Sequence, residues 1–314
     1  MLGHEIMVDP LSIVTWKWDN GIHIKKNLKF TSQHVNIMKN MLTRNLTIPF
    51  KFFCVTDDPQ GLDDDIHVIP LWNDYRNLGG CFTRLKCFQK EMRFLFGERF
   101  ASIDIDAVIV GNVDHIFSRT EDFLIAGGED RRTKFCGCFF IMASGCRSEV
   151  WETFSPDLVR TYPTKFIQGK KFYIRGTDQF HITNVLGRRD ETILGNKEGL
   201  YMFGQDIFVE RKKVVDRNMV AEATKHLVVR QNGIIRRMRN SSKRQSLKNQ
   251  LEEIKEEIAR ITAEIESNSE LEKNKRWSSE KLPSDASIVF FNGKYDPSQK
   301  RLQNAFPWIR ENWY

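Results

Sequence analysis

Short apolar runs near the start of the chain alternate with a segment of helical periodicity, and this alternation limits the folds that the chain can adopt. Residues 11–16 and 50–56 are short, apolar and rich in β-branched and aromatic side chains, which indicates strands. Between them, residues 35–42 carry apolar side chains at helical spacing. A strand, helix, strand order predicts a parallel sheet whose ligand-binding loops follow the carboxyl ends of the strands.

The alternation continues along the chain, which predicts an α/β fold. With 314 residues and 40% hydrophobic content, the chain is long enough to bury one sizeable core. The further elements that we expect are strands at residues 67–71, 99–103, 138–143 and 287–291 and helices at residues 82–96 and 177–186.

The chain carries no hydrophobic stretch of the roughly 20 residues that a membrane-spanning helix needs, and its first residues lack a signal-peptide pattern. We therefore expect a cytoplasmic protein. Its six cysteines form no C-x-x-C ligand pairs and lie mostly in apolar runs, which favours reduced, buried thiols. Cys136 and Cys138 are either a redox or metal pair or, as we favour, alternate residues that share one face of a strand.

A block of basic residues follows residue 210 and contains only two carboxylates, Asp216 and Glu222. It fits an anionic partner such as DNA or another anionic polymer, or else the solvated surface of a helix. The twelve basic residues of residues 211–248 are Arg211, Lys212, Lys213, Arg217, Lys225, Arg230, Arg236, Arg237, Arg239, Lys243, Arg244 and Lys248.

Apolar residues at heptad spacing come next, at steps of four and three residues from Leu247 to Ile265. Such a seam predicts a helical hairpin or self-association through residues 247–265, while an amphipathic helix packed on the body is the alternative. Because strand-like sequence returns afterwards, we expect an insertion in one domain. The predicted boundaries are 1–215 and 284–314 for the core and 216–283 for a basic helical or coiled-coil arm.

Two carboxylates, Asp104 and Asp106, follow the predicted strand at residues 99–103. Such a D-x-D pair presents the oxygen ligands that Mg²⁺ and Mn²⁺ prefer, and the cation in turn neutralises a leaving diphosphate. Exposed acidic loops also produce this pattern, so the D-x-D pair indicates a metal site only if the surrounding sequence supports one.

Four ordered matches surround the pair: residues 52–62 (F-F-C-V-T-D-D-P-Q-G-L), residues 104–111 (D-I-D-A-V-I-V-G), residues 176–179 (G-T-D-Q) and residues 291–297 (F-N-G-K-Y-D-P). With Thr83-Arg84-Leu85-Lys86, they resemble motifs of GT-A glycosyltransferases of the glycogenin-like and lipooligosaccharide galactosyltransferase-like family, above all its bacterial and phage members. The resemblance implies a Rossmann-like nucleotide-binding sheet flanked by helices. It also implies a nucleotide-sugar donor, typically a UDP-sugar, and a Mn²⁺ or Mg²⁺ cofactor.

The resemblance also assigns roles to individual residues. Asp178 and Gln179 match the catalytic D-Q pair beside the transferred sugar, although Thr177 and Asp178 are also good helix-capping residues. Asp104, Asp106 and Asn292 match the metal ligands. The positions that match donor-binding residues are Thr15, Trp16, Asp57, Arg84, Lys86, Asp104 and Lys294.

The sequence departs from the family pattern at two positions. Asn292 stands where relatives carry a histidine ligand, and Asp296 replaces a basic residue, which puts metal affinity and phosphate contacts in doubt. We therefore keep three functions open. The first is transfer of a sugar to a hydroxyl acceptor, with retention of configuration as in most relatives. The second is the same chemistry on a modified DNA base, and the third is a non-catalytic coiled-coil adaptor.

Overall fold

The computed structural model describes residues 9–18, 30–75, 78, 81–130, 133–162, 164–166, 173–175, 177–207, 217–238, 244–268, 282–292 and 295–314. The chain divides into two compact units, Met1–Phe208 together with Ser278–Tyr314, and Val209–Trp277. The smaller unit corresponds to the inserted arm, which the sequence placed at residues 216–283. We call the two units the core and the arm.

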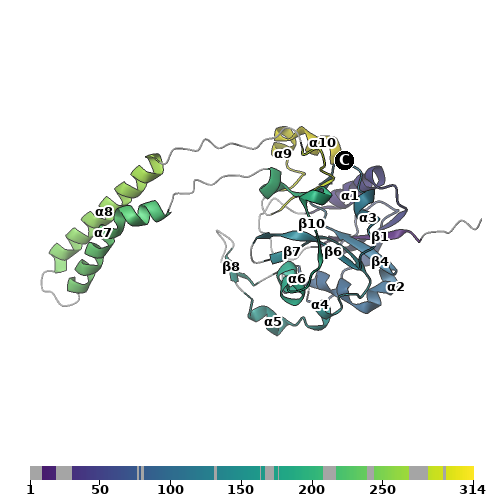
Figure 1. The fold of residues 1–314 in the computed structure, drawn as a ribbon, viewed down its shortest axis with the longest axis horizontal. Helices are drawn as coiled ribbons and strands as arrows, with labels where there is room; N and C mark the ends of the chain where they lie inside the picture. Colours follow the sequence, from purple (N-terminus) through teal and green to yellow (C-terminus); the bar gives the residue numbers. More distant parts are fainter. Residues whose placement is uncertain are drawn as a thin grey trace, which may run out of the picture. The chain divides into compact units, whose positions relative to one another are not determined.

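A seven-stranded sheet forms the centre of the core, in the order β10-β6-β7-β4-β1-β2-β3 (Figure 1). Only β7 among these strands runs antiparallel to its neighbours, β4 and β6. The α/β fold class with a largely parallel sheet is therefore confirmed. The strands are β1 (Leu11–Lys17), β2 (Phe50–Thr56), β3 (His67–Pro70), β4 (Arg99–Ile103), β6 (Phe123–Asp130), β7 (Thr133–Ala143) and β10 (Thr192–Leu194).

The strand order changes direction at β1. The chain passes from β1 outward to β2 and β3, and it then returns to place β4 on the other side of β1. In open α/β sheets, ligands bind at such a switch point, beyond the carboxyl ends of the two strands. The residues that follow β1 and β4 are therefore the candidates for ligand binding.

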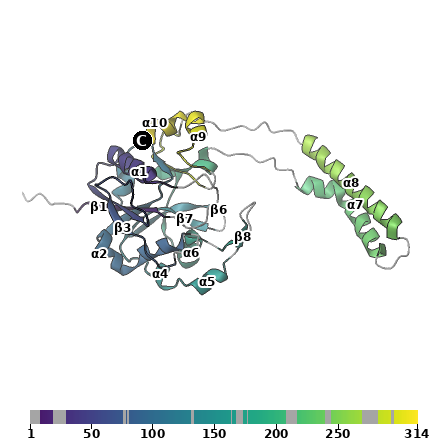
Figure 2. The same cartoon turned by 180° about the vertical axis from the view of Figure 1, so that it is seen from behind.

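Two apolar layers cover the two faces of the sheet because successive residues of each strand point to opposite sides. Ile13 packs with α1 and the C-terminal helices, whereas Val14 packs with residues 82–96 and α6. Figures 1 and 2 show the helices and the sheet of the core from opposite sides. The helices of the core are α1 (Ser32–Asn45), α2 (Arg93–Phe96), α3 (Asp114–Phe117), α4 (Glu149–Glu152), α5 (Pro156–Arg160), α6 (Asp178–Leu186), α9 (Lys300–Ala305) and α10 (Pro307–Asn312).

The predicted helix at residues 82–96 is wrong in type. The structure has 3₁₀ helices at Phe82–Phe88 and Lys90–Met92, followed by the single turn of α2. Cys81 is left-handed, with φ of 63°, and Gln89 is extended, with ψ of 144°, so no continuous α-helix can form. Nearly all side chains of Phe82–Phe88 are buried, including Arg84, and this burial overrides the helical pattern.

A second, three-stranded sheet brings the C-terminal part back to the core. Its order is β11 (Leu200–Met202), β12 (Ile288–Phe290) and β5 (Ala107–Ile109), with β11 parallel and β5 antiparallel to β12. The Phe203 and Phe291 rings stack with centroids 4.5 Å apart, which extends this contact beyond the strands. A separate two-stranded sheet joins β8 (Thr164–Phe166) to β9 (Tyr173–Arg175).

The arm is a helical hairpin of α7 (Arg217–Met238) and α8 (Arg244–Asn268), which lie side by side in both views (Figures 1 and 2). Leu227 and Ile234 of α7 are buried against Leu247 and Ile254 of α8. The heptad seam of α8 is thus covered by α7 of the same chain, as the hairpin interpretation predicted, and self-association through it stays a prediction. Among the described residues, no helix combines the length and the apolar character needed to cross a bilayer.

Candidate active site

Two side-chain hydrogen bonds tie β1 to β4 at the switch point. Thr15 Oγ1 donates to the carbonyl oxygen of Ile103 at 2.9 Å, and Trp16 Nε1 donates to Ser102 Oγ at 2.9 Å. Both Thr15 and Trp16 are buried, with exposed fractions of 0% and 4%. These two predicted donor-binding residues therefore fix the position of the loop that carries Asp104, and direct donor contact by them stays a prediction.

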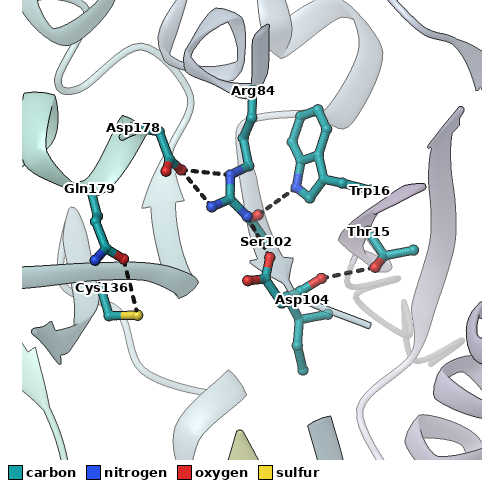
Figure 3. Close-up of polar contacts among 9 residues, drawn as sticks. Thr15, Trp16, Arg84, Ser102, Asp104, Cys136, Asp178 and Gln179 are labelled. Atoms are coloured by element: carbon teal, nitrogen blue, oxygen red, sulfur yellow. Dashed lines mark hydrogen bonds and ion pairs between the residues drawn. The ribbon is translucent and has the colours of Figure 1, made fainter. Parts of the chain in front are cut away.

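Arg84 lies between two carboxylates that come from distant parts of the chain (Figure 3). Its Nε donates to Asp178 Oδ2 at 2.8 Å and one terminal nitrogen donates to the same oxygen at 2.5 Å. The other terminal nitrogen donates to Asp104 Oδ1. The side chains of Arg84 and Asp178 are only 8% and 5% exposed, whereas that of Asp104 is 28% exposed. The structure thus brings three predicted site residues into one ion-pair cluster.

The electrostatics of this cluster favour the charged state of Arg84. Burial alone would lower the pKa of the guanidinium, but the carboxylates of Asp104 and Asp178 outweigh it and hold that pKa well above its ordinary value. A planar guanidinium suits this position because its fork reaches two carboxylates at once. Arg84 therefore holds the D-x-D loop and the start of α6 in a fixed relation.

Helix α6 presents both residues of the predicted D-Q pair. Thr177 is its N-cap, and Thr177 Oγ1 accepts a hydrogen bond from the Phe180 backbone N–H at 3.3 Å. Asp178 follows in the first turn, where its carboxylate faces Arg84 rather than capping the helix. The capping interpretation thus applies to Thr177, and Asp178 is engaged in the ion-pair cluster.

Strand β7 touches each part of the site through three consecutive residues, Cys136, Gly137 and Cys138. Cys136 Sγ donates to Gln179 Oε1 at 3.6 Å, and the Cys138 carbonyl oxygen accepts from the backbone N–H of Asp104 at 2.8 Å. Between them, a methyl group on Gly137 would stand 2.7 Å from Asp178 Oδ2. Sequence analysis missed Gly137, although a glycine inside an apolar strand is a signal for close approach of other groups.

All six cysteines are reduced, as expected, and Cys54, Cys87, Cys136 and Cys138 are buried. Cys136 and Cys138 are buried, and neither forms a disulfide. The alternative that they form a redox pair is therefore not supported, and Cys136 instead contributes to the position of Gln179.

Asp106 lies next to the segment that carries Asn292. The backbone N–H of Phe291 donates to the carbonyl oxygen of Asp106 at 2.8 Å, so Asn292 follows directly on this contact. Burial, and then the carboxylates of Asp104 and Asp296, hold the pKa of Asp106 well above its ordinary value. The structure therefore pairs the backbone of Asp106 with that of the residue before Asn292, and a shared metal site of the two side chains stays a prediction.

Asp296 adds negative charge at this point. Burial would raise the pKa of Asp296, but hydrogen bonds from His34 and Ser298 outweigh it and lower that pKa. The Ser298 backbone N–H donates to Asp296 Oδ1 at 2.8 Å, and His34 Nε2 lies 3.4 Å from the same oxygen. The lowered pKa of Asp296 favours its charged form, which in turn contributes to the raised pKa of Asp106.

These residues fit a divalent cation. A bound cation would offset the burial and the repulsion from Asp104 and Asp296 that together raise the pKa of Asp106. In the part of the chain that the structure describes, no group of three or more His, Cys, Asp or Glu side chains has the arrangement of a metal site. A site with two carboxylates and an amide suits Mg²⁺ or Mn²⁺, because Mg²⁺ keeps waters and binds substrate phosphates as further ligands.

The remaining predicted donor-binding residues are Lys86, Asp57 and Lys294. Lys86 Nζ donates to Asp74 Oδ2 at 2.5 Å and lies 5.8 Å from the centre of the Trp72 ring. Asp57 is exposed directly after β2, at the same end of the sheet as the switch point. Lys294 lies outside the described residues. Roles of Lys86, Asp57 and Lys294 in donor binding stay predictions.

Two solved glycosyltransferase structures align with most of the chain. A crystal structure of the galactosyltransferase LgtC in complex with donor and acceptor sugar analogs covers 97% of this chain and 97% of its own, with a TM-score of 0.47 and 8% identity. The apo-form glycosyltransferase GlyE of Streptococcus pneumoniae gives a TM-score of 0.44 and 13% identity; 97% of this chain aligns with 61% of that protein. The chain matches no protein-family model and no curated protein sequence. With similarities this low, the function has to be inferred from the side chains of the site itself.

Proposed function

We propose that the chain is a metal-dependent GT-A glycosyltransferase that moves a sugar from a nucleotide-diphosphate donor to a hydroxyl acceptor. One observation carries this proposal: Arg84 joins Asp104 of the D-x-D motif to Asp178 of the D-Q motif, beyond the carboxyl end of β4 at the switch point of the sheet. The two motifs were assigned to one site from sequence resemblance alone, and they meet through a buried guanidinium.

Asp104, Asp106 and Asn292 would hold the Mg²⁺ or Mn²⁺ ion, which supplies positive charge beside the diphosphate as it leaves. The Asp104 side chain is 28% exposed, so a donor would reach it from solvent. Because Arg84 is paired with Asp104, the guanidinium would also restrain the carboxylate in one orientation for the metal.

Asp178 and Gln179 would orient the transferred sugar. Gln179 is fixed by the contact between its Oε1 and Cys136 Sγ, and Asp178 by its pair with Arg84. We propose retention of configuration by attack on the face that the diphosphate leaves. The bond from the anomeric carbon to the phosphate oxygen breaks, the bond to the acceptor oxygen forms, and the acceptor proton passes to the leaving phosphate oxygen.

The decisive experiment measures thermal stabilisation and slow donor hydrolysis with a panel of nucleotide sugars and Mn²⁺. The wild-type chain is compared with Asp106→Asn, and Asp64→Asn serves as the control because Asp64 is an exposed carboxylate in the connection between β2 and β3. We expect one donor to stabilise the wild type and the control in the presence of Mn²⁺, with turnover lost in Asp106→Asn.

The anomeric configuration of the product, read from its proton NMR spectrum, tests the retention proposal separately. An inverted product would overturn the front-side scheme and leave sugar transfer intact. If no donor stabilises the wild type with or without Mn²⁺, the transferase proposal fails and the chain is better described as a non-catalytic adaptor.

A further inference from the structure

The helical hairpin of the arm gathers basic side chains at one end. Helix α7 ends at Met238 and α8 begins at Arg244, so the last turns of α7 lie beside the first turns of α8. Residues 230–251 contain seven basic residues and no Asp or Glu. We call the described residues 230–238 and 244–251 the basic end. In the sequence, the seven basic residues of 230–251 are Arg230, Arg236, Arg237, Arg239, Lys243, Arg244 and Lys248, of which Arg239 and Lys243 lie outside the described residues.

The opposite end of the hairpin has a different charge pattern. Residues 252–266 of α8 contain six glutamates against Lys255 and Arg260. In the described part of the arm, the two ion pairs lie outside the basic end: Lys255 with Glu252 at 2.7 Å and Lys225 with Glu222 at 3.3 Å. Positive charge is therefore neutralised at one end of the hairpin and concentrated at the other.

The basic end exposes hydrogen-bonding groups as well as charge. Arg230, Arg236, Arg237 and Lys248 are all exposed, and so are the amide side chains of Asn232, Gln245 and Asn249. Arg and Lys together with Asn and Gln are the side chains that donate hydrogen bonds to phosphate oxygens of nucleic acids. Helix packing thus presents phosphate-binding groups on two adjacent helices within about 12 Å along the hairpin axis, the length of eight residues of α-helix.

The composition of the arm selects among anionic partners. Residues 217–268 contain no Phe, Trp or Tyr. Helices that insert in a membrane surface use Trp, Phe and Leu on an apolar face, and here the main apolar faces of α7 and α8 are buried against each other. Proteins that bind single strands stack aromatic side chains on the bases. A duplex, which is bound through its phosphates, fits the arm better than a membrane or a single strand.

We propose that the basic end of the arm binds duplex nucleic acid through the phosphate backbone without reading the base sequence. Each neutralised phosphate releases counterions, so the affinity falls with salt at a slope of about −0.9 per phosphate contacted. The proposal is independent of the candidate active site, because every residue that carries it lies in α7 and α8.

Fluorescence anisotropy of a labelled random-sequence DNA duplex tests the proposal with the full chain. The triple variant R230Q/R236Q/R237Q removes three exposed charges from the basic end, and K225Q/K255Q/R260Q removes three exposed charges from the rest of the hairpin. We expect the first variant to bind about tenfold or more weakly and to lower the salt slope by about 3, and the second to bind like the wild type. Circular dichroism shows whether both variants keep their helix content.

Three results would overturn the proposal. The first is that the wild type does not bind the duplex at low salt. The second is that both triple variants lose affinity equally, which would show that binding depends only on the total charge of the arm, and the third is that the chain binds anionic lipid vesicles and not the duplex. Asp106→Asn should bind DNA like the wild type, so the failure of sugar transfer and the failure of nucleic-acid binding are told apart by separate measurements.

Discussion

Gly137 faces the carboxylate of Asp178 so closely that a methyl group on its Cα would stand 2.7 Å from Oδ2. The same methyl group would stand 2.9 Å from a terminal nitrogen of Arg84. Since the Arg84 and Asp178 side chains are only 8% and 5% exposed, neither has solvent-filled space into which to move. The absence of a side chain at position 137 is therefore a requirement of the ion-pair cluster.

The substitution Gly137→Ala should separate Arg84 from Asp178 and destabilise the core by about 1–3 kcal/mol, the usual cost of overpacking a buried site. Urea denaturation measures this change, and donor-induced thermal stabilisation should fall with it. Gly195→Ala is the matched control, because a methyl group there meets no atom within 4 Å. Equal stability of the two variants would show that the cluster adapts to the added carbon.

The substitution Arg84→Gln should leave the buried carboxylate of Asp178 without its guanidinium. Removal of one partner of a buried ion pair commonly costs about 3–5 kcal/mol, and urea denaturation checks this figure. Arg160→Gln removes an arginine that is 77% exposed and pairs with Asp157, so its free energy of unfolding should match that of the wild type. A loss in Arg84→Gln no larger than in Arg160→Gln would contradict the role assigned to the cluster.

The raised pKa of Asp106 makes the stability of the core depend on pH. In the folded chain, this carboxyl keeps its proton above pH 3.8, the ordinary value of an aspartate. Its contribution to stability is therefore present in acid and is lost as the pH rises from about 3.8 through the folded pKa. In buffer without divalent metal, Asp106→Asn should gain stability over the wild type as the pH rises toward neutrality. Urea denaturation at a series of pH values measures this difference, and a constant difference across the series would count against the raised pKa.

The packing of the arm predicts opposite results for two neighbouring residues. Ile234 is fully buried between α7 and α8, whereas Ile235 is 40% exposed. Ile234→Asp places a charge in the seam and should unfold the hairpin, with loss of helical circular dichroism and no change in the unfolding of the core. Ile235→Asp should keep the helices. Similar spectra for the two variants would show that the seam does not hold the hairpin together.

Local pattern was sufficient to predict strands β1 to β4, part of β7 and the helix that begins near Thr177, whereas strands β6 and β10 of the same sheet were not predicted. Strand Phe50–Thr56 has a clear apolar pattern, and the helix at Asp178–Leu186 has an N-cap residue. Both signals depend only on residues that are close in the sequence. The prediction of a continuous α-helix at residues 82–96 was wrong because the Arg84 side chain pairs with Asp104 and Asp178, which lie far away in the sequence. The tertiary ion pairs override the local preference for a helix.

For the site, sequence resemblance indicated which residues belong together, but it gave no contacts between them. Arg84, Asp104 and Asp178 meet as expected, whereas Lys86 contacts Asp74 instead of this cluster. Gly137 carries no functional group, so its role becomes visible only when the atoms opposite its Cα are known. The raised pKa of Asp106 likewise depends on its burial, and then on Asp104 and Asp296, and the fold alone determines the burial and the approach of Asp296.

The arm is inserted between two strands, β11 and β12, that are hydrogen-bonded neighbours in the core. Pairing of these strands therefore has to close a loop that includes the whole arm. The entropy lost on loop closure grows only with the logarithm of loop length, so even a long insertion adds little to this cost. When α7 and α8 have already paired, much of that loop is no longer flexible chain. A hairpin that forms by itself would thus lower the entropy cost of pairing β12 with β11.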